Sequence, residues 1–143
     1  MCIRDRSSVL YSDFGVDVGF GYNRKEAKDH GEGGTLVGSA LPQQRVVILD
    51  DVITAGTAVR EVVELLYSVQ AKPVGVVIAL DRDEIRAQDD RISAVQAVAR
   101  DLGISVLSIV GLKELQMFLE QSSQYDAATL ESVIRYRKEY GAS

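Results

Sequence analysis

The stretch that decides the fold is RVVILDDVITAGTA, residues 45–58. It opens with an apolar run from Val46 to Leu49, which is followed directly by two carboxylates, Asp50 and Asp51. A short turn of small and hydroxylated residues comes next, and a helical pattern begins at about Val59. Open α/β proteins build ligand sites from this order of parts, at the carboxyl end of a parallel strand. The stretch therefore predicts an α/β fold with a ligand site at the tip of this strand.

The turn over residues 54–58 has the chemistry of a phosphate site. Its backbone N–H groups can converge on one point, Thr54 and Thr57 add hydroxyl donors, and the following helix adds partial positive charge. Small residues let the backbone approach a ligand closely. Asp50 and Asp51 lie one step upstream, where they can accept hydrogen bonds from sugar hydroxyls or stabilise a cationic transition state. The alternative is a strand that ends in a solvated Asp-Asp turn before a Thr-capped helix.

The residues around this stretch predict a mostly parallel sheet. The run after Arg45 is almost wholly apolar, as expected of a central strand covered on both faces. Val59–Gln70 has the apolar spacing of a helix, Pro73 ends the connection, and Val74–Leu80 reads as a second buried strand. Further elements are a helix that ends at Leu102 before a Gly103 cap, a strand over Ile104–Val110, and helices over Leu112–Leu119 and Ala127–Tyr140. We expect the cluster of Tyr136, Arg137, Lys138 and Tyr140 to be a helix surface, and the alternative is a nucleic-acid patch.

The first part of the chain is less regular. Met1–Ser8 has no clear period and no apolar core of a secretory signal, and we interpret it as a foreign lead-in to a domain that spans residues 9–143. Val9–Phe14 has the character of a helix end, and Val16–Tyr22 and Thr35–Ala40 have strand patterns. Between these strands lies a cationic, glycine-rich segment that cannot bury a face, so we expect a mobile loop or a solvated turn.

Composition excludes several classes of protein. A chain of 143 residues suits one domain, and 46% hydrophobic and 26% charged residues are ordinary for a globular protein. No apolar run approaches the ~18 residues of a membrane helix. A net charge of −5 argues against general nucleic-acid binding. Cys2 is the only cysteine and His30 the only histidine, which excludes an internal disulfide and multi-cysteine or multi-histidine metal sites. A single cysteine also fits a reduced, cytoplasmic location.

Two motifs resemble those of a known enzyme family. DDVITAGTA, residues 50–58, resembles the 5-phosphoribosyl-1-pyrophosphate (PRPP) motif of type I phosphoribosyltransferases. NRKEAKDHGEGG, residues 23–34, resembles the catalytic loop of orotate phosphoribosyltransferases. The resemblance covers the chain from about Val16 to its C-terminus. It implies a three-layer, Rossmann-like α/β core with a mostly parallel sheet.

The resemblance also implies roles for individual residues. Asp50 and Asp51 would hold the ribose hydroxyls and take part in catalysis. PRPP would further be bound by Arg24, Lys25, Lys28, His30, Val52, Ile53, Thr54, Ala55, Gly56, Thr57 and Ala58. Lys28 is expected to matter most for rate, because cations carried by a closing loop stabilise charge on departing pyrophosphate. The plainer interpretation of His30 is a lone surface histidine.

Arg82 is the candidate for recognising the base. It follows the second predicted strand, where a guanidinium can bind a planar carboxylate with two parallel hydrogen bonds. An LDR segment contacts orotate in orotate phosphoribosyltransferases, so the resemblance implies that Arg82, together with Thr54, binds orotate. The alternative is an arginine paired with Asp81, Asp83 or Glu84 on a solvated turn.

The implied activity is that of a pentosyltransferase in de novo pyrimidine (UMP) biosynthesis. Ribose 5-phosphate would pass from PRPP to orotate, giving orotidine 5-phosphate and pyrophosphate. Mg²⁺ would bind mainly through PRPP oxygens, so no protein metal ligand is expected. The family forms homodimers, in which the loop Arg24–Gly34 would reach the partner's site. The family also carries a hood segment before the position of Val9, and its absence here predicts weak or no activity for this chain alone. The alternatives are a PRPP-binding regulator and a phosphoribosyltransferase that uses a purine or uracil.

Overall fold

The computed structural model describes residues 3–24, 36–85 and 92–142. Its elements follow the order α1 (Ile3–Phe14), β1 (Gly21–Asn23), β2 (Leu36–Gly38), β3 (Arg45–Val52), α2 (Thr57–Ser68), β4 (Lys72–Asp81), α3 (Ala94–Leu102), β5 (Ser105–Gly111), α4 (Leu112–Gln121) and α5 (Ala127–Tyr140). This alternation of strands and helices confirms the predicted α/β class.

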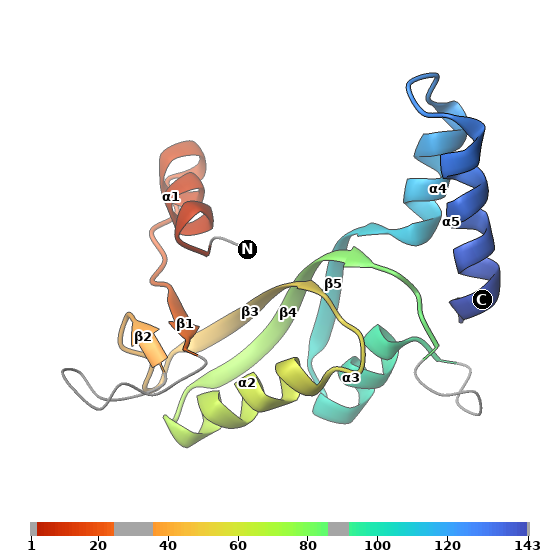
Figure 1. Ribbon diagram of the computed structural model, residues 1–143. Helices are drawn as coiled ribbons and strands as arrows, with labels where there is room; N and C mark the ends of the chain where they lie inside the picture. Colours follow the sequence, from red (N-terminus) through yellow and green to blue (C-terminus); the bar gives the residue numbers. More distant parts are fainter. Residues whose placement is uncertain (1–2, 25–35, 86–91, 143) are drawn as a thin grey trace.

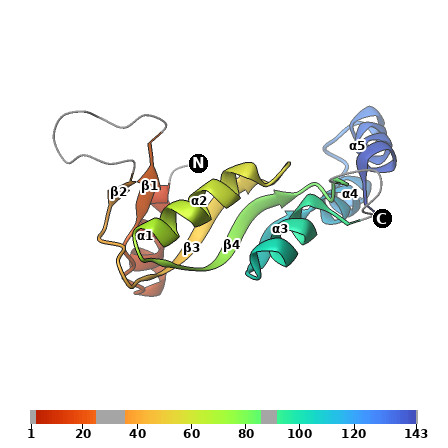
Figure 2. The same ribbon diagram turned by 90° about the horizontal axis from the view of Figure 1, so that it is seen from below.

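The main sheet has three parallel strands in the order β3-β4-β5. Helix α2 connects β3 to β4 and helix α3 precedes β5, and both helices lie on the same face of the sheet (Figure 1; Figure 2). Strands β1 and β2 form a separate antiparallel pair near the amino-terminal end of β3. The strand–helix–strand unit that the sequence predicts after residue 45 is therefore confirmed.

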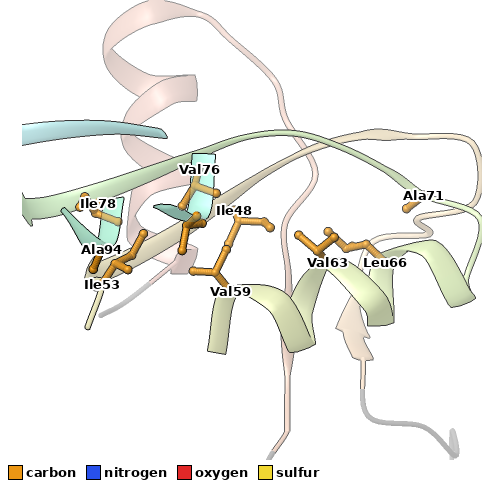
Figure 3. Packing of buried hydrophobic residues seen from close by; sticks show 10 residues of the cluster. Ile48, Ile53, Val59, Val63, Leu66, Ala71, Val76, Ile78 and Ala94 are labelled. Atoms are coloured by element: carbon orange, nitrogen blue, oxygen red, sulfur yellow. The ribbon is translucent and has the colours of Figure 1, made fainter. Parts of the chain in front are cut away.

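The core lies between the sheet and helix α2. The buried face of α2 consists of Val59, Val63 and Leu66, at the helical spacing that the sequence shows. These side chains face Ile48 of β3 and Val76 of β4, which are also buried (Figure 3). Fully burying one such side chain stabilises a fold by about 1.5–3 kcal/mol. This packing fixes where β3 ends and α2 begins, and so positions the turn between them.

The other face of the sheet is largely exposed among the described residues, although Arg6 of α1 lines a small hollow on it with Leu49 and Val77. Val47, Leu107 and Ile109 expose 51%, 64% and 65% of their surface. Strand β3 also lies at one edge of the three-stranded sheet, because β4 occupies the centre. The expectation of a central first strand covered on both faces is therefore wrong for β3. The apolar run suggests cover on both faces, but the outward face carries an exposed residue, Val47, and meets only Arg6 of α1 beside Leu49.

Several element boundaries differ from the predicted ones. Strand β3 continues through both carboxylates to Val52, and the strands expected over 16–22 and 35–40 are confined to β1 and β2. Pro73 lies inside β4 instead of ending the connection before it. The register between β3 and β4 shifts next to the pair Val46 and Pro73, and such an irregularity tolerates the missing N–H of proline.

Other predictions are confirmed at the level of single residues. Helix α5 has the predicted bounds, and Gly103 is the C-terminal cap of α3 with a φ of 64°. The side chain of Ser93 caps the start of α3 by accepting a hydrogen bond from the Gln96 N–H at 3.1 Å. Helix α1 begins at Ile3, so part of the segment interpreted as a lead-in is helical and continuous with the expected helix end.

Candidate functional site

The candidate site lies where β3 and β4 end side by side. Val52 and Leu80 are register partners near the carboxyl ends of these strands. Neighbouring strands lie about 4.8 Å apart, so the turn that follows Val52 and the segment that follows Asp81 leave the sheet next to each other. Ligand sites of open parallel sheets form at this edge. The structure thus brings the predicted phosphate turn and the predicted base-recognition segment to one place.

Asp50 and Asp51 differ in their surroundings. Asp50 is half-buried, and burial raises the pKa of its carboxyl, with repulsion from Asp51 acting in the same direction. Asp51 is exposed, and the N–H of Val52 donates to its Oδ1 at 2.8 Å, which lowers the pKa of Asp51. The Asp51 carboxylate is therefore the one that is easily kept ionised, while Asp50 is held in a less polar setting. Two carboxyls at a strand tip can accept hydrogen bonds from a diol.

Most residues of the turn between β3 and α2 are exposed, and Gly56 is buried. Thr54, Ala55, Thr57 and Ala58 are exposed, whereas the side chain of Ile53 is only 5% exposed and belongs to the core. The expected PRPP contact at Ile53 can therefore involve only its backbone. The buried side chain anchors the turn to the sheet, as Figure 3 shows. The exposed residues are left to face a ligand.

Gly56 sets the shape of the turn. It adopts a left-handed conformation with a φ of 76° and stands at the N-cap position of α2, where no side chain caps the helix. The N–H groups of the first helical turn therefore have no side-chain partner at the cap position. Uncapped N–H groups together with the helix dipole attract anions. The geometry suits a phosphate group placed against residues 54–58.

Helix α3 supports this turn from behind. Val98 of α3 packs so closely on Gly56 that a Cβ atom at residue 56 would collide with Val98 Cγ2. One turn further along α2, Arg60 donates to Asp101 of α3 at 2.8 Å. The sequence does not point to Val98, Arg60 or Asp101 as site residues, because contacts between helices that are about 40 residues apart leave no local pattern.

Arg82 stands at the tip of β4, as predicted. Its Nε lies 3.2 Å from Oε1 of Glu84, and the two side chains expose 28% and 21% of their surface. Arg82 Nε is buried without a hydrogen bond of good geometry, so the contact with Glu84 is a charge pair. The alternative prediction is that Arg82 pairs with a neighbouring acid. This pairing is confirmed, and the acid is Glu84. The pairing leaves the terminal NH₂ groups of the guanidinium as further donors.

Arg24 is not brought to the phosphate turn. It directly follows β1, which lies near the amino-terminal end of β3, whereas the phosphate turn leaves the carboxyl end (Figure 1). The predicted PRPP contacts Lys25, Lys28 and His30 lie outside the described residues. Strands β1 and β2 do flank the segment between residues 23 and 36, so the prediction of a connection between two strands is confirmed.

Membrane spans and metal clusters are both absent from the described part of the chain. No helix in it is both long enough and apolar enough to span a membrane. Residues 3–24, 36–85 and 92–142 contain no group of three or more histidine, cysteine, aspartate or glutamate side chains that could hold a metal ion.

Comparison with known proteins identifies relatives that are phosphoribosyltransferases. Residues 5–105 match the model of the phosphoribosyl transferase domain family. Among curated relatives, the orotate phosphoribosyltransferase of Chromobacterium violaceum is 57% identical over 135 residues, which are 94% of this chain and 61% of the relative. That of Bordetella petrii is 54% identical over 130 residues, 89% of this chain and 57% of the relative. The chain thus spans about three fifths of the length of these relatives.

Solved structures give the same result. The orotate phosphoribosyltransferase of Francisella tularensis has a TM-score of 0.74 at 32% identity, over 94% of this chain and 62% of that one. The UMP synthase of Leishmania donovani has a TM-score of 0.69 at 25% identity, over 93% of this chain and 26% of that one. These structures share the arrangement of sheet and helices that positions the turn after β3. With a family model matched over most of its length and this fold, the chain belongs to the phosphoribosyl transferase domain family.

Proposed function

We propose that this chain is the PRPP-binding part of an orotate phosphoribosyltransferase. The observation that carries the proposal is the exposed turn over residues 54–58, which joins the Asp50–Asp51 strand tip to the uncapped start of α2. The printed names of the relatives at 54% and 57% identity support the choice of activity. The reaction replaces the C1–oxygen bond between ribose and pyrophosphate with a bond from C1 to N1 of orotate, and N1 loses its proton.

The described residues divide the proposed work between two segments. The 5-phosphate of PRPP binds the N–H groups and the hydroxyls of Thr54 and Thr57, while Asp50 and Asp51 accept hydrogen bonds from the ribose hydroxyls. The ionised Asp51 carboxylate also stabilises the positive charge that develops on the sugar as pyrophosphate departs. Arg82 binds the carboxylate of orotate. Each group acts from the edge of the sheet where β3 and β4 end.

Mg²⁺ and a second subunit complete the proposal. Mg²⁺ prefers oxygen ligands and keeps several waters, so it would be held mainly by PRPP oxygens, with the exposed carboxylate of Asp51 beside its waters, and it would supply positive charge to the pyrophosphate. The position of Arg24, near the end of β3 opposite the turn, supports a homodimer in which the segment after Arg24 serves the partner's site. Lys25, Lys28 and His30 would deliver their charge to pyrophosphate there. The protein would act in the cytoplasm, in pyrimidine biosynthesis.

The test follows the loss of orotate absorbance in the presence of PRPP and Mg²⁺. It uses this chain and a chimera that supplies the part of the Chromobacterium violaceum relative that this chain does not span. We expect the chimera to consume orotate and to release pyrophosphate in equal amounts, and Thr57→Val to weaken PRPP binding. A chimera that binds PRPP but consumes no orotate contradicts the proposed activity. A chimera that accepts a purine or uracil in place of orotate identifies a different phosphoribosyltransferase.

A further inference from the structure

The segment that carries Arg82 is tied to the far end of the chain. The N–H of Ile85 donates to the carbonyl of Tyr140 at 2.9 Å, and the N–H of Ala142 donates to the carbonyl of Asp83 at 2.7 Å. Glu84 and Gly141 form an antiparallel bridge between these hydrogen bonds. Residues 83–85 and the end of α5 thus pair like two short strands. The backbone that follows Arg82 is held by contacts that are more than 50 residues away in sequence.

A side-chain relay runs parallel to this backbone pairing. The hydroxyl of Tyr136 on α5 donates to Oε1 of Glu84, and the same oxygen lies 3.2 Å from Nε of Arg82. Tyr136 and Glu84 are both half-buried, and the ring of Tyr136 packs on the ring of Tyr140 with 5.0 Å between centroids. The hydrogen bond with Glu84 raises the pKa of Tyr136, so its hydroxyl stays protonated as a donor at neutral pH. Glu84 is therefore held from both sides.

This arrangement restricts the guanidinium of Arg82. An arginine side chain at a strand tip has many rotamers, and holding it in one of them costs conformational entropy. The pair with Glu84 engages Nε and leaves the two terminal NH₂ groups, which form the fork that binds a carboxylate through parallel hydrogen bonds. A carboxylate ligand then meets an arginine that is already oriented.

We propose that Tyr136 and Glu84 are positioning residues for Arg82, so that helix α5 sets the affinity of the site for the carboxylate of the base. This inference rests on the proposed function, because it takes a carboxylate-bearing base as the ligand of Arg82. Neither residue touches the substrate. Tyr136 acts through Glu84, and Glu84 acts through Arg82.

The test compares Tyr136→Phe with Tyr140→Phe, its matched control on the same helix. Both changes remove one hydroxyl and keep the ring, but Tyr140 is exposed and only Tyr136 contacts Glu84 in the described structure. We expect Tyr136→Phe to raise the KM for orotate about tenfold, as the loss of a hydrogen bond to a charged group does, and to leave the KM for PRPP unchanged. Tyr140→Phe should leave both values unchanged. The measurements use the chimera described above.

A second readout examines the orientation of Arg82 in this chain without substrate. The Nε–H signal of Arg82 in a ¹⁵N-labelled sample is assigned by its loss in Arg82→Lys. We expect its exchange with solvent to accelerate in Tyr136→Phe and in Glu84→Gln, and to stay unchanged in Tyr140→Phe. A role confined to stability predicts instead that Tyr136→Phe lowers the melting temperature without changing the ratio of the two KM values.

The outcomes separate this inference from the proposed function. If the unaltered chimera consumes orotate and Tyr136→Phe has the same KM for orotate, the positioning role is wrong and the proposed function stands. If the KM values for orotate and PRPP rise together, helix α5 supports the whole fold and does not position Arg82. If the unaltered chimera neither binds nor consumes orotate, the proposed function fails, and the positioning role fails with it.

Discussion

Gly56 and Val98 are in contact across the start of helix α2, and the valine occupies the space that a side chain at residue 56 would need. The φ of 76° at Gly56 adds a second constraint, because an L-residue is strained in the left-handed region. The phosphate turn thus takes its shape from helix α3 as well as from its own residues. A change at either residue should alter ligand binding.

We expect Gly56→Ala to weaken the binding of PRPP more than it lowers stability. The added methyl group must displace Val98, which shifts the first turn of α2 away from the phosphate. Gly103→Ala is the matched control, since Gly103 has a φ of 64° but open space around it. Gly103→Ala should lose only about 1–2 kcal/mol of folding stability, which is the cost of the left-handed conformation for an L-residue. Calorimetric titration with PRPP and thermal melts of both variants check this, and equal PRPP affinities would contradict it.

The double variant Gly56→Ala with Val98→Ala sharpens that experiment. Val98→Ala removes the methyl group that would collide, so part of the lost PRPP affinity should return even though a buried side chain has been shortened. Double-mutant cycles isolate this type of coupling. Additive losses at the two positions would show that Val98 does not shape the turn.

The different surroundings of Asp50 and Asp51 predict opposite effects on stability. The pKa of Asp50 is raised in the folded state, so its charge opposes folding at neutral pH, and this penalty shrinks as pH falls below the folded-state pKa and is gone below the unfolded-state pKa. Asp50→Asn should therefore raise the melting temperature at pH 7 and have little effect near pH 3, below the ordinary aspartate pKa of about 3.9. The same variant should lose PRPP affinity, because it removes a charged acceptor for the ribose hydroxyls.

Asp51→Asn provides the comparison for that variant. The pKa of Asp51 is lowered by the N–H of Val52, so its charge contributes stability that is present above the unfolded-state pKa and is lost as pH falls through the folded-state pKa. We expect Asp51→Asn to lower the melting temperature at pH 7. Thermal melts of both variants between pH 3 and pH 7 test the assignment, and the same direction of change in both would contradict it.

The open face of the sheet predicts self-association. Leu107 and Ile109 are both exposed on β5, and contiguous exposed apolar surface promotes contacts between molecules. We expect Leu107→Thr with Ile109→Thr to reduce concentration-dependent association while the melting temperature changes little, because neither side chain is buried and threonine suits a strand. Phe14→Ser, on helix α1, is a control for the loss of exposed apolar surface elsewhere. Sedimentation at several protein concentrations measures the association of each variant. An equal reduction of association in both variants would contradict a role for this face.

Sequence patterns predict this fold best where the signal is local. The βαβ unit over residues 45–81 combines an apolar run, a glycine turn and a helical period, and each of these is visible within a window of about ten residues. The Gly103 cap and the bounds of α5 are of the same kind. The turn over residues 54–58 is recognisable as a candidate ligand site for the same reason, because its small and hydroxylated residues are consecutive.

Contacts between distant segments could not be predicted in this way. The apolar run of β3 resembles that of a central strand, because a pattern does not show how many of its faces are covered. The cluster from Tyr136 to Tyr140 lies on the surface of helix α5 as expected, but the hydrogen bond from its Tyr136 hydroxyl to Glu84 has no local sequence signal. The support of Gly56 by Val98 likewise depends on how two helices pack.

The two halves of the candidate site differ in how they are encoded. The turn over residues 54–58 and strands β3 and β4 belong to one run, Arg45–Asp81, but Val98 of α3 supports the turn from outside this run, so a transplanted turn would have to bring helix α3 with it. Arg82, the proposed contact for the base, pairs instead with Glu84, which accepts a hydrogen bond from Tyr136 near the C-terminal end of the described chain. On the proposed function, variation in affinity for the base is therefore to be sought in the last dozen residues, far in sequence from the turn over residues 54–58.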